Sequence, residues 1–211
     1  MDEPLSNLDA KLRGQMRTEI SKLHNKLQTT FIYVTHDQTE AMTMGTRIVV
    51  MKDGIIQQID SPQHLYDHPV NMFVGGFIGS PAMNFVEGKI EKIDDSIYLV
   101  FGSSKVKVPE GRCANLADYI GKTVTMGVRS ENIHDEEVYL ANSADSVVTA
   151  EVEVVELMGS ETLLYLNIEG ASFIAKVDPR SQAKVGDKIK VAFDMNRIHF
   201  FDKETELTIL G

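Results

Sequence analysis

Tryptophan is absent from the 211 residues, cysteine occurs once, and acidic residues outnumber basic ones by 31 to 21. The single cysteine, Cys113, cannot form an internal disulfide, which favours a reducing compartment. A formal charge of -10 repels nucleic-acid phosphates, so general nucleic-acid binding is disfavoured. No apolar run approaches the length that spans a bilayer, and no secretion-type leader opens the sequence. These absences favour a protein of the cytosol, or one that docks from the cytosol onto another component.

The composition is that of a folded protein. Apolar residues make up 43% of the chain, and no segment is polar enough to indicate disorder. The length allows one large domain or two small ones.

The pattern up to residue 35 predicts a helix followed by a strand. Apolar residues recur every three or four positions from 8 to 27, which is the spacing of one helix face. Ser6 and Asp9 precede that helix with the spacing of a capping box. Residues 31–35, "FIYVT", form a short apolar and β-branched run, which is typical of a strand buried on both faces.

The next stretch continues the alternation of helices and strands. Asp37 and Glu40 repeat the capping-box spacing and predict a second helix. The segment 47–59, "RIVVMKDGIIQQI", predicts two strands joined by a turn at Asp53-Gly54. Ser61 and Pro62 then open another helix. Helix, strand, helix, strand is half of an α/β unit.

Polar side chains gather where this unit would place a ligand. Ligands of open α/β sheets lie at the carboxyl ends of the strands. Asp2 and Glu3 precede the first helix and His36 precedes the second, so we expect all three on one sheet edge. Simpler interpretations stay open: the acids would favour the positive end of a helix, Ser6 would be only a cap, and His36 would be structural.

From about residue 80 the pattern changes to short alternating runs separated by turn residues. Many short strands at close spacing predict a small all-β barrel or sandwich. Some small barrels bind nucleic acids through basic grooves and exposed aromatic residues, but this segment is acid-rich and has no tryptophan. An oxyanion-binding barrel of the molybdate type also ranks low, because no cluster of basic residues or Ser/Thr-Gly nest stands out.

Several motifs carry a resemblance to a known family. The opening "MDEPLSNLDA" resembles the Walker B end and D-loop of an ABC transporter ATPase, and "YVTHDQTEAM" resembles the segment with its switch histidine. The run from "TRIVVMKDG" to "GSPAMNF" and the later "GVRSENI" are similar to the maltose and multiple-sugar import ATPases. The resemblance implies an α/β remnant of a P-loop ATPase domain, residues 1–79. An all-β OB-like (TOBE-type) barrel, residues 80–211, would follow as a regulatory and dimerisation domain.

The resemblance also implies roles for five residues. Asp2 would hold the Mg²⁺ of MgATP through water, and Glu3 would polarise the water that attacks the γ-phosphate. His36 would contact the γ-phosphate. Ser6 and Asp9 would belong to a D-loop that faces the second subunit across a composite ATP site. Carboxylates and an imidazole suit phosphoryl transfer, which needs a metal, an oriented nucleophile and donors to phosphate oxygens.

The loop that cradles phosphates, G-x-x-x-x-G-K-[ST], does not occur in the sequence. Gly121-Lys122-Thr123 supplies only its last three letters, since Leu116 stands where the first glycine belongs. The glutamine loop and LSGGQ signature of the family are absent too. We therefore expect a mis-assigned start or a truncation, and a 211-residue chain that neither binds ATP tightly nor hydrolyses it.

The resemblance further implies a homodimer that works with the membrane permease subunits of a sugar importer on the cytoplasmic face of the membrane. In some members, sugar-phosphotransferase proteins regulate the C-terminal domain, so such a regulator is a candidate partner. The alternative interpretation is a regulatory and dimerisation module that needs no nucleotide. His64 and His68 have zinc-binding spacing without an evident third ligand. Arg129 and Glu131 are expected to form a structural ion pair or an interface contact rather than a catalytic site.

Overall fold

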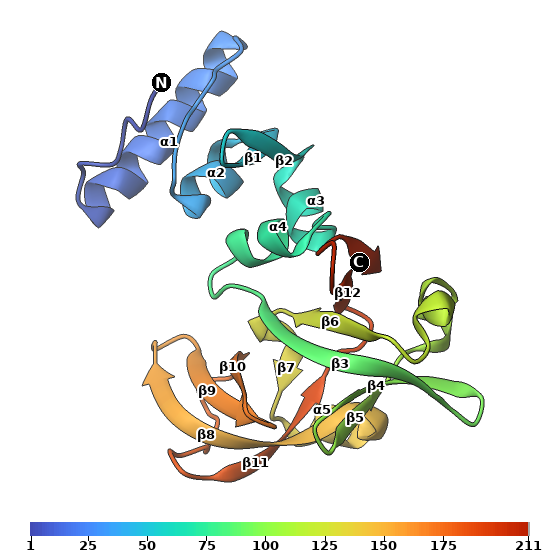
Figure 1. Ribbon diagram of the computed structural model, residues 1–211. Helices are drawn as coiled ribbons and strands as arrows, with labels where there is room; N and C mark the ends of the chain where they lie inside the picture. Colours follow the sequence, from blue (N-terminus) through green and yellow to red (C-terminus); the bar gives the residue numbers. More distant parts are fainter. Residues whose placement is uncertain (211) are drawn as a thin grey trace. The chain divides into compact units, whose positions relative to one another are not determined.

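The computed structural model describes residues 1–210, which form two compact units (Figure 1). The first runs from Met1 to Asp67 and the second begins at His68. Helix α4 (Met72–Phe77) therefore lies with the second unit, where the N–H of Met72 donates to the carbonyl of Glu206 at 3.0 Å. The division into domains at residue 79 stays a prediction. None of the helices within residues 1–210 combines the length and apolar character that a bilayer crossing requires.

The first unit contains most of the helices and strands that local patterns predict. They are α1 (Ala10–Leu27), α2 (Gln38–Met44), β1 (Ile48–Lys52), β2 (Ile55–Asp60) and α3 (Pro62–Asp67). The hairpin β1–β2 turns at Asp53 and Gly54, which both have positive φ, 52° and 77°. Such a turn matches the twist of the two strands that it joins.

The predicted cap of α1 is wrong in one respect. Asp9, not Ser6, is the N-cap: its Oδ1 accepts from the N–H groups of Lys11 and Leu12 at 3.1 and 3.0 Å. The Ser6 hydroxyl instead donates to the carbonyl of Glu3 at 3.0 Å. Two capping residue types three positions apart are both suitable, and the turn at Glu3 commits Ser6 elsewhere.

The prediction of a strand buried on both faces at residues 31–35 is also wrong. Ile32 is 77% exposed, and Val34 alone makes a β-bridge, with Asp2. Helix α1 likewise has no buried residue. An apolar run is buried as a strand only when sheet neighbours and covering helices surround it, and here its one pairing partner is the first few residues.

The second unit is built from antiparallel strands in two sheets, with short helices between them. One sheet has the order β13-β12-β6-β3-β4-β5 and the other β10-β9-β8-β11-β7. The strands are β3 (Asn84–Ile93), β4 (Ser96–Phe101), β5 (Ser104–Lys107), β6 (Thr123–Val128), β7 (Ile133–His134), β8 (Val147–Leu157), β9 (Thr162–Ile168), β10 (Ala171–Val177), β11 (Lys188–Phe193), β12 (His199–Asp202) and β13 (Thr208–Leu210). The helical turns are α5 (Glu137–Asn142), η1 (Glu110–Arg112), η2 (Ala114–Tyr119), η3 (Ser130–Asn132) and η4 (Ala144–Ser146). The predicted change to an all-β architecture is confirmed.

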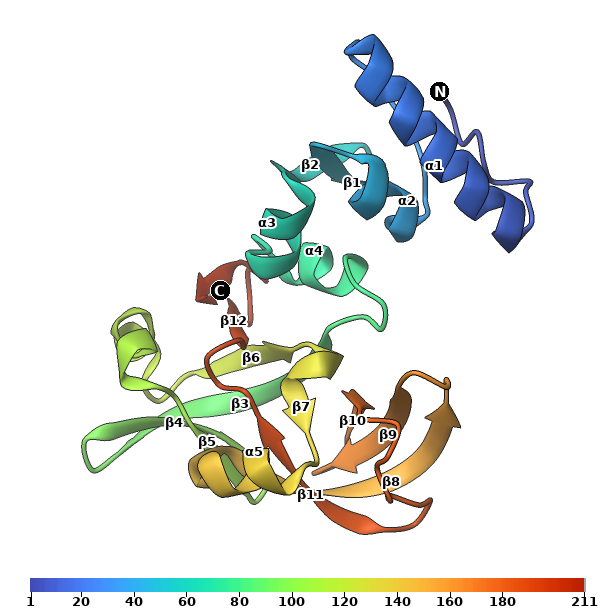
Figure 2. The same cartoon turned by 180° about the vertical axis from the view of Figure 1, so that it is seen from behind.

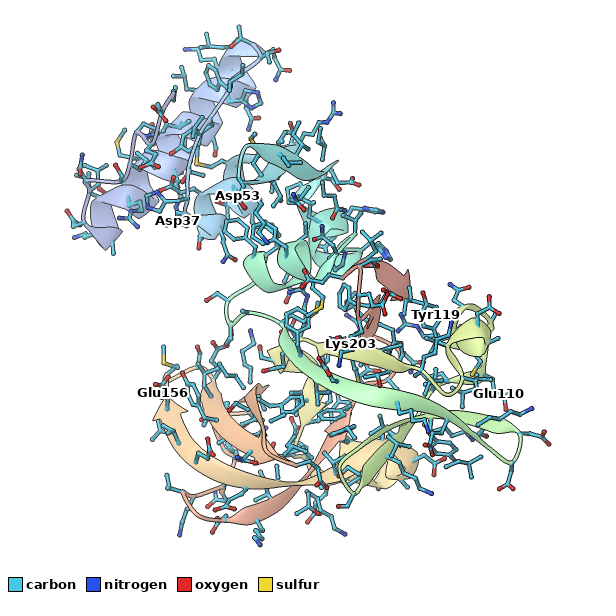
Figure 3. All side chains as sticks on the ribbon, viewed as in Figure 1. Asp37, Asp53, Glu110, Tyr119, Glu156 and Lys203 are labelled. Carbon is cyan, nitrogen blue, oxygen red and sulfur yellow. The ribbon has the colours of Figure 1, made fainter. Side chains whose placement is uncertain are left out.

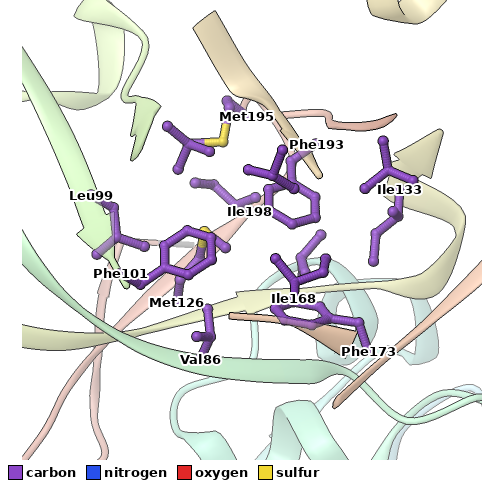
Figure 4. Close-up of a cluster of buried hydrophobic side chains, with 14 of the residues drawn as sticks. Val86, Leu99, Phe101, Met126, Ile133, Ile168, Phe173, Phe193, Met195 and Ile198 are labelled. Carbon is purple, nitrogen blue, oxygen red and sulfur yellow. The ribbon is translucent and has the colours of Figure 1, made fainter. Parts of the chain in front are cut away.

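One hydrophobic core joins the two sheets of this unit (Figure 4). Strand β9 shows the alternation that produces it, because every second side chain, such as Leu164 and Leu166, is buried. Phe173 of β10 stacks on Phe193 of β11 with ring centroids 5.7 Å apart. These two aromatic side chains thus fill the core.

Two buried polar side chains complete the packing. Asn84 of β3 donates from Nδ2 to the carbonyls of Val128 and Ile174 at 3.1 and 3.0 Å, and its Oδ1 accepts from the N–H of Ile174 at 2.7 Å. Because Ile174 lies on β10, this side chain joins the two sheets. Arg129 is buried and its Nη1 donates to the carbonyl of Ile78 at 2.6 Å, which gives it a structural contact.

The turn between β4 and β5 requires glycine, and this can be tested. Gly102 has φ +57°, and a Cβ there would collide with the Glu169 side chain, whose own Cβ would lie 2.8 Å away. We expect Gly102→Ala to lower the free energy of unfolding by about 1–2 kcal/mol. Gly111→Ala is the matched control, since nothing lies within 4 Å of its added Cβ. Equal urea midpoints for the two variants would contradict this interpretation.

Candidate functional site

A parallel β-bridge at the start of the chain places two predicted site segments side by side. Asp2 bridges to Val34: the N–H of Glu3 donates to the carbonyl of Val34, and the N–H of Val34 to the carbonyl of Met1, both at 2.9 Å. Since the two segments run in the same direction, the residues that follow each of them leave at the same edge. His36 therefore comes next to Glu3.

The side chains of Glu3 and His36 form an ion pair. His36 Nδ1 lies 3.1 Å from Glu3 Oε1, with 73% of the histidine and 46% of the glutamate side chain exposed. The hydrogen bond and the charge of Glu3 raise the pKa of His36 above its ordinary value. The pair thus stabilises the fold below the ordinary histidine pKa, and this contribution is lost as pH rises through the raised value.

The backbone of Glu3 adopts a conformation that few non-glycine residues take. Its φ is 40°, in the left-handed region. This conformation, the bridge on its N–H and the Ser6 hydroxyl on its carbonyl together fix where the Glu3 carboxylate leaves the chain. Unusual φ values of this kind cluster at functional sites.

Asp2, Ser6 and Asp9 are the other predicted site residues. Asp2 is exposed beside Glu3 and shares its bridge to Val34. The hydroxyl and N–H of Ser6 both donate to the carbonyl of Glu3, and the Asp9 carboxylate is occupied as the cap of α1. The structure thus brings Glu3 and His36 together and ties Ser6 to the main chain of Glu3, while Asp9 caps the helix.

These residues fit part of a site for MgATP. An exposed carboxylate can hold Mg²⁺ through water, and an imidazole can donate to a phosphate oxygen. No group of three His, Cys, Asp or Glu side chains able to hold a metal ion occurs within residues 1–210. His64, part of the histidine pair with zinc-binding spacing, has its Nδ1 2.8 Å from Asp60 Oδ2.

A hydrogen-bond network beside His36 involves residues for which the sequence patterns predict no site role. Glu40, 2% exposed, accepts at Oε2 from the hydroxyls of Tyr33 and Thr35 at 3.0 and 2.7 Å. Asp37, labelled in Figure 3, caps α2 and also pairs with Arg13 at 3.2 Å. Burial together with Glu40 raises the pKa of Tyr33. Burial works against ionisation of Asp37, but N–H donors from Glu40 and Thr39 and the charge of Arg13 hold its pKa below the ordinary value.

The second unit has an open cavity of about 700 Å³, lined by residues from the range 107–196. It lies where α5 packs beside β11 (Figure 2). Its lining includes Lys107 and Asp145, whose charged atoms are 3.9 Å apart, and the stacked rings of His134 and Tyr139. None of the predicted site residues lines the cavity, so the cavity is not the site that the sequence predicts. Lys107 and Asp145 pair with each other, whereas Glu3 and His36 meet where two parallel segments end, so the candidate site is the pair of Glu3 and His36.

Comparison with known proteins supplies the family. Residues 79–133 match the MalK OB fold domain, and residues 142–200 match the TOBE domain. The oligosaccharides import ATP-binding protein MsmX of Bacillus subtilis is 57% identical over 211 residues, which are 99% of this chain and 57% of MsmX. The uncharacterized ABC transporter ATP-binding protein YcjV of Escherichia coli O157:H7 is 50% identical, with 99% and 56% covered. The osmoprotective compounds uptake ATP-binding protein GgtA of Synechocystis is 48% identical over 99% of the chain and 57% of GgtA.

The fold and these matches define a class: ABC transporter ATP-binding proteins that carry an OB-like and a TOBE domain. More narrowly, the chain belongs to the MalK and MsmX type and corresponds to its C-terminal region. The chain spans about half the length of the curated relatives that it matches. The expected OB-like, TOBE-type domain is confirmed.

Proposed function

We propose that the region spanned by these residues works in the ATP-hydrolysing subunit of a bacterial carbohydrate ABC importer. The observation that carries the proposal is the ion pair of Glu3 and His36 at the end of the parallel bridge. A carboxylate and an imidazole so placed can act together on a water molecule and a phosphate oxygen. The names of MsmX and GgtA, an oligosaccharide importer protein and an osmoprotectant uptake protein, support an importer of small solutes.

In this proposal each residue has a defined task. Bound MgATP supplies the reactive phosphoryl group and the metal charge. Asp2 would hold the metal through water, Glu3 would accept a hydrogen bond from the attacking water and orient it, and His36 would donate to the γ-phosphate oxygens. Ser6 and Asp9 face the second subunit of a homodimer. The subunit contacts membrane permeases from the cytoplasmic side, and a phosphotransferase regulator of the β unit stays a prediction.

These 211 residues contain no phosphate-binding loop, so the test compares this chain with a chimera that has one. We expect the 211-residue chain alone to show no magnesium-dependent ATP hydrolysis, because no glycine-rich loop or lysine holds the β- and γ-phosphates. A chimera that places the remaining N-terminal part of MsmX before this chain should hydrolyse ATP. The measurement is phosphate release by both proteins with and without Mg²⁺.

The second candidate function is a dimerisation module that needs no nucleotide. The hydrophobic core that the second unit has of its own favours this function. Light scattering of the same two proteins separates the functions. An MgATP-driven dimer of the chimera supports the ATPase. A chimera that is dimeric with and without MgATP, and that releases no phosphate, would overturn it in favour of the module.

A further inference from the structure

Glu40 is a buried acid that the proposed ATPase function does not use. It lies on α2, where an acid in the first turn is ordinarily solvated, yet it is only 2% exposed. Two hydroxyls donate to one of its carboxylate oxygens, from Tyr33 at 3.0 Å and Thr35 at 2.7 Å. A buried carboxylate with two donors is a strong anchor, because either donor would be costly to lose.

Thr35 links this anchor to the segment that carries His36. Its hydroxyl donates to Glu40 and accepts from the N–H of Asp37 at 3.0 Å, so hydrogen bonds fix the main chain on both sides of His36. The β-bridge to Asp2 fixes Val34, the residue before Thr35. Residues 28–33 belong to no strand, so a sheet ladder does not hold His36 in place.

Arg13 extends the network to the segment around Glu3. Its Nη1 donates to Asp37 Oδ2 at 3.2 Å and its Nη2 to the carbonyl of Leu8 at 3.1 Å. Leu8 lies in the segment with D-loop resemblance. The Arg13 guanidinium thus joins Asp37, which follows His36, to Leu8, which precedes the N-cap of α1.

We propose that Thr35 and Glu40, supported by the Arg13–Asp37 pair, are positioning residues that hold the His36 imidazole against Glu3. An exposed ion pair between two mobile side chains stabilises little by itself, because ordering both chains costs entropy. Here 73% of the His36 side chain is exposed, so the main chain must supply the order. The acids that act on His36 are Glu3, Asp37 and Glu40, and Glu3 makes the direct contact. The importance of this positioning for ATP hydrolysis rests on the proposed function.

The test is an NMR titration of the His36 ring Cε1–H in the 211-residue chain, without nucleotide. The signal is assigned from its absence in His36→Gln. Glu3→Gln removes the direct partner and should return the pKa of His36 toward its ordinary value. Thr35→Val keeps the shape but loses the hydroxyl, and should move the pKa most of the way to the Glu3→Gln value. Thr35→Ser keeps the hydroxyl and should leave the pKa of His36 at its native value.

A second pair of variants covers the case in which Thr35→Val does not fold. Tyr33→Phe removes the second hydroxyl donor to Glu40 without changing any charge, and should lower the pKa of His36 in the same direction by a smaller amount. Tyr165→Phe, which removes a hydroxyl donor to Glu156 in the second unit, should leave it unchanged. Circular dichroism and the other histidine signals report whether each variant is folded.

A folded Thr35→Val with the native pKa at His36 would overturn the proposal, as would an unchanged pKa in Glu3→Gln. Should Thr35→Val unfold, an unchanged pKa in Tyr33→Phe would overturn it. Because this titration contains no ATP, its failure leaves hydrolysis by the chimera untouched. An inactive chimera likewise leaves the titration result standing.

Discussion

Replacing Glu3 with glutamine in the chimera with MsmX should abolish ATP turnover and leave ATP binding nearly unchanged. Glutamine has the shape of glutamate but lacks the negative charge that orients and polarises a water molecule. General-base and water-orienting carboxylates contribute about 10²- to 10⁴-fold to rates, so we expect a loss of that size in kcat. Nucleotide affinity should stay close to the parent value, because binding comes mainly from phosphate contacts elsewhere.

The matched control for this variant is Glu19→Gln. Glu19 is an exposed acid of α1 that pairs with Lys22, so the substitution removes the same charge at a place without chemistry. Phosphate release measures kcat, and fluorescent-nucleotide titration measures ATP affinity. Turnover by Glu3→Gln within a factor of two of Glu19→Gln would remove the proposed role of Glu3. Loss of nucleotide affinity together with turnover would make Glu3 a binding residue instead.

Short-range patterns were sufficient for most helices and strands of the first unit. The hairpin at Asp53-Gly54, the start of α2 at Asp37 and the start of α3 at Pro62 all depend on residues within a few positions. The prediction of a buried strand at residues 31–35 failed, because burial of a strand depends on segments far away in sequence. Met1 to Glu3 supply the one pairing partner of this segment, and a single bridge does not bury it.

The candidate site shows the same division. The nearness of Glu3 and His36 agrees with the rule that parallel strands place their exits on one edge, although the roles of both residues stay predictions. The burial of Glu40 was missed because its spacing from Asp37 also fits a capping box. A usable signal was present: Tyr33 and Thr35 alternate along an extended segment, so both hydroxyls leave on one side.

Replacing Asn84 with alanine should destabilise the second unit more than any surface substitution. Asn84 is 7% exposed and joins β3 to β10 through both main-chain groups of Ile174. Alanine would leave the buried carbonyl of Val128 and the partly buried N–H and carbonyl of Ile174 without this partner, and a buried group left so costs about 1–3 kcal/mol. We expect the free energy of unfolding to fall by about 2–4 kcal/mol, measured by urea denaturation with circular dichroism.

The control for Asn84→Ala is Asn115→Ala, at an exposed position of η2, which should change stability by less than about 0.5 kcal/mol. Asn84→Asp tests the mechanism separately. It keeps the acceptor for the N–H of Ile174 but replaces the amide donor with a second oxygen, which repels the carbonyls of Val128 and Ile174. A variant as unstable as Asn84→Ala would place the stabilisation in the donated bonds. If Asn84→Ala and Asn115→Ala unfold at the same urea concentration, the two sheets are held by their shared apolar core, and the polar link between them is dispensable.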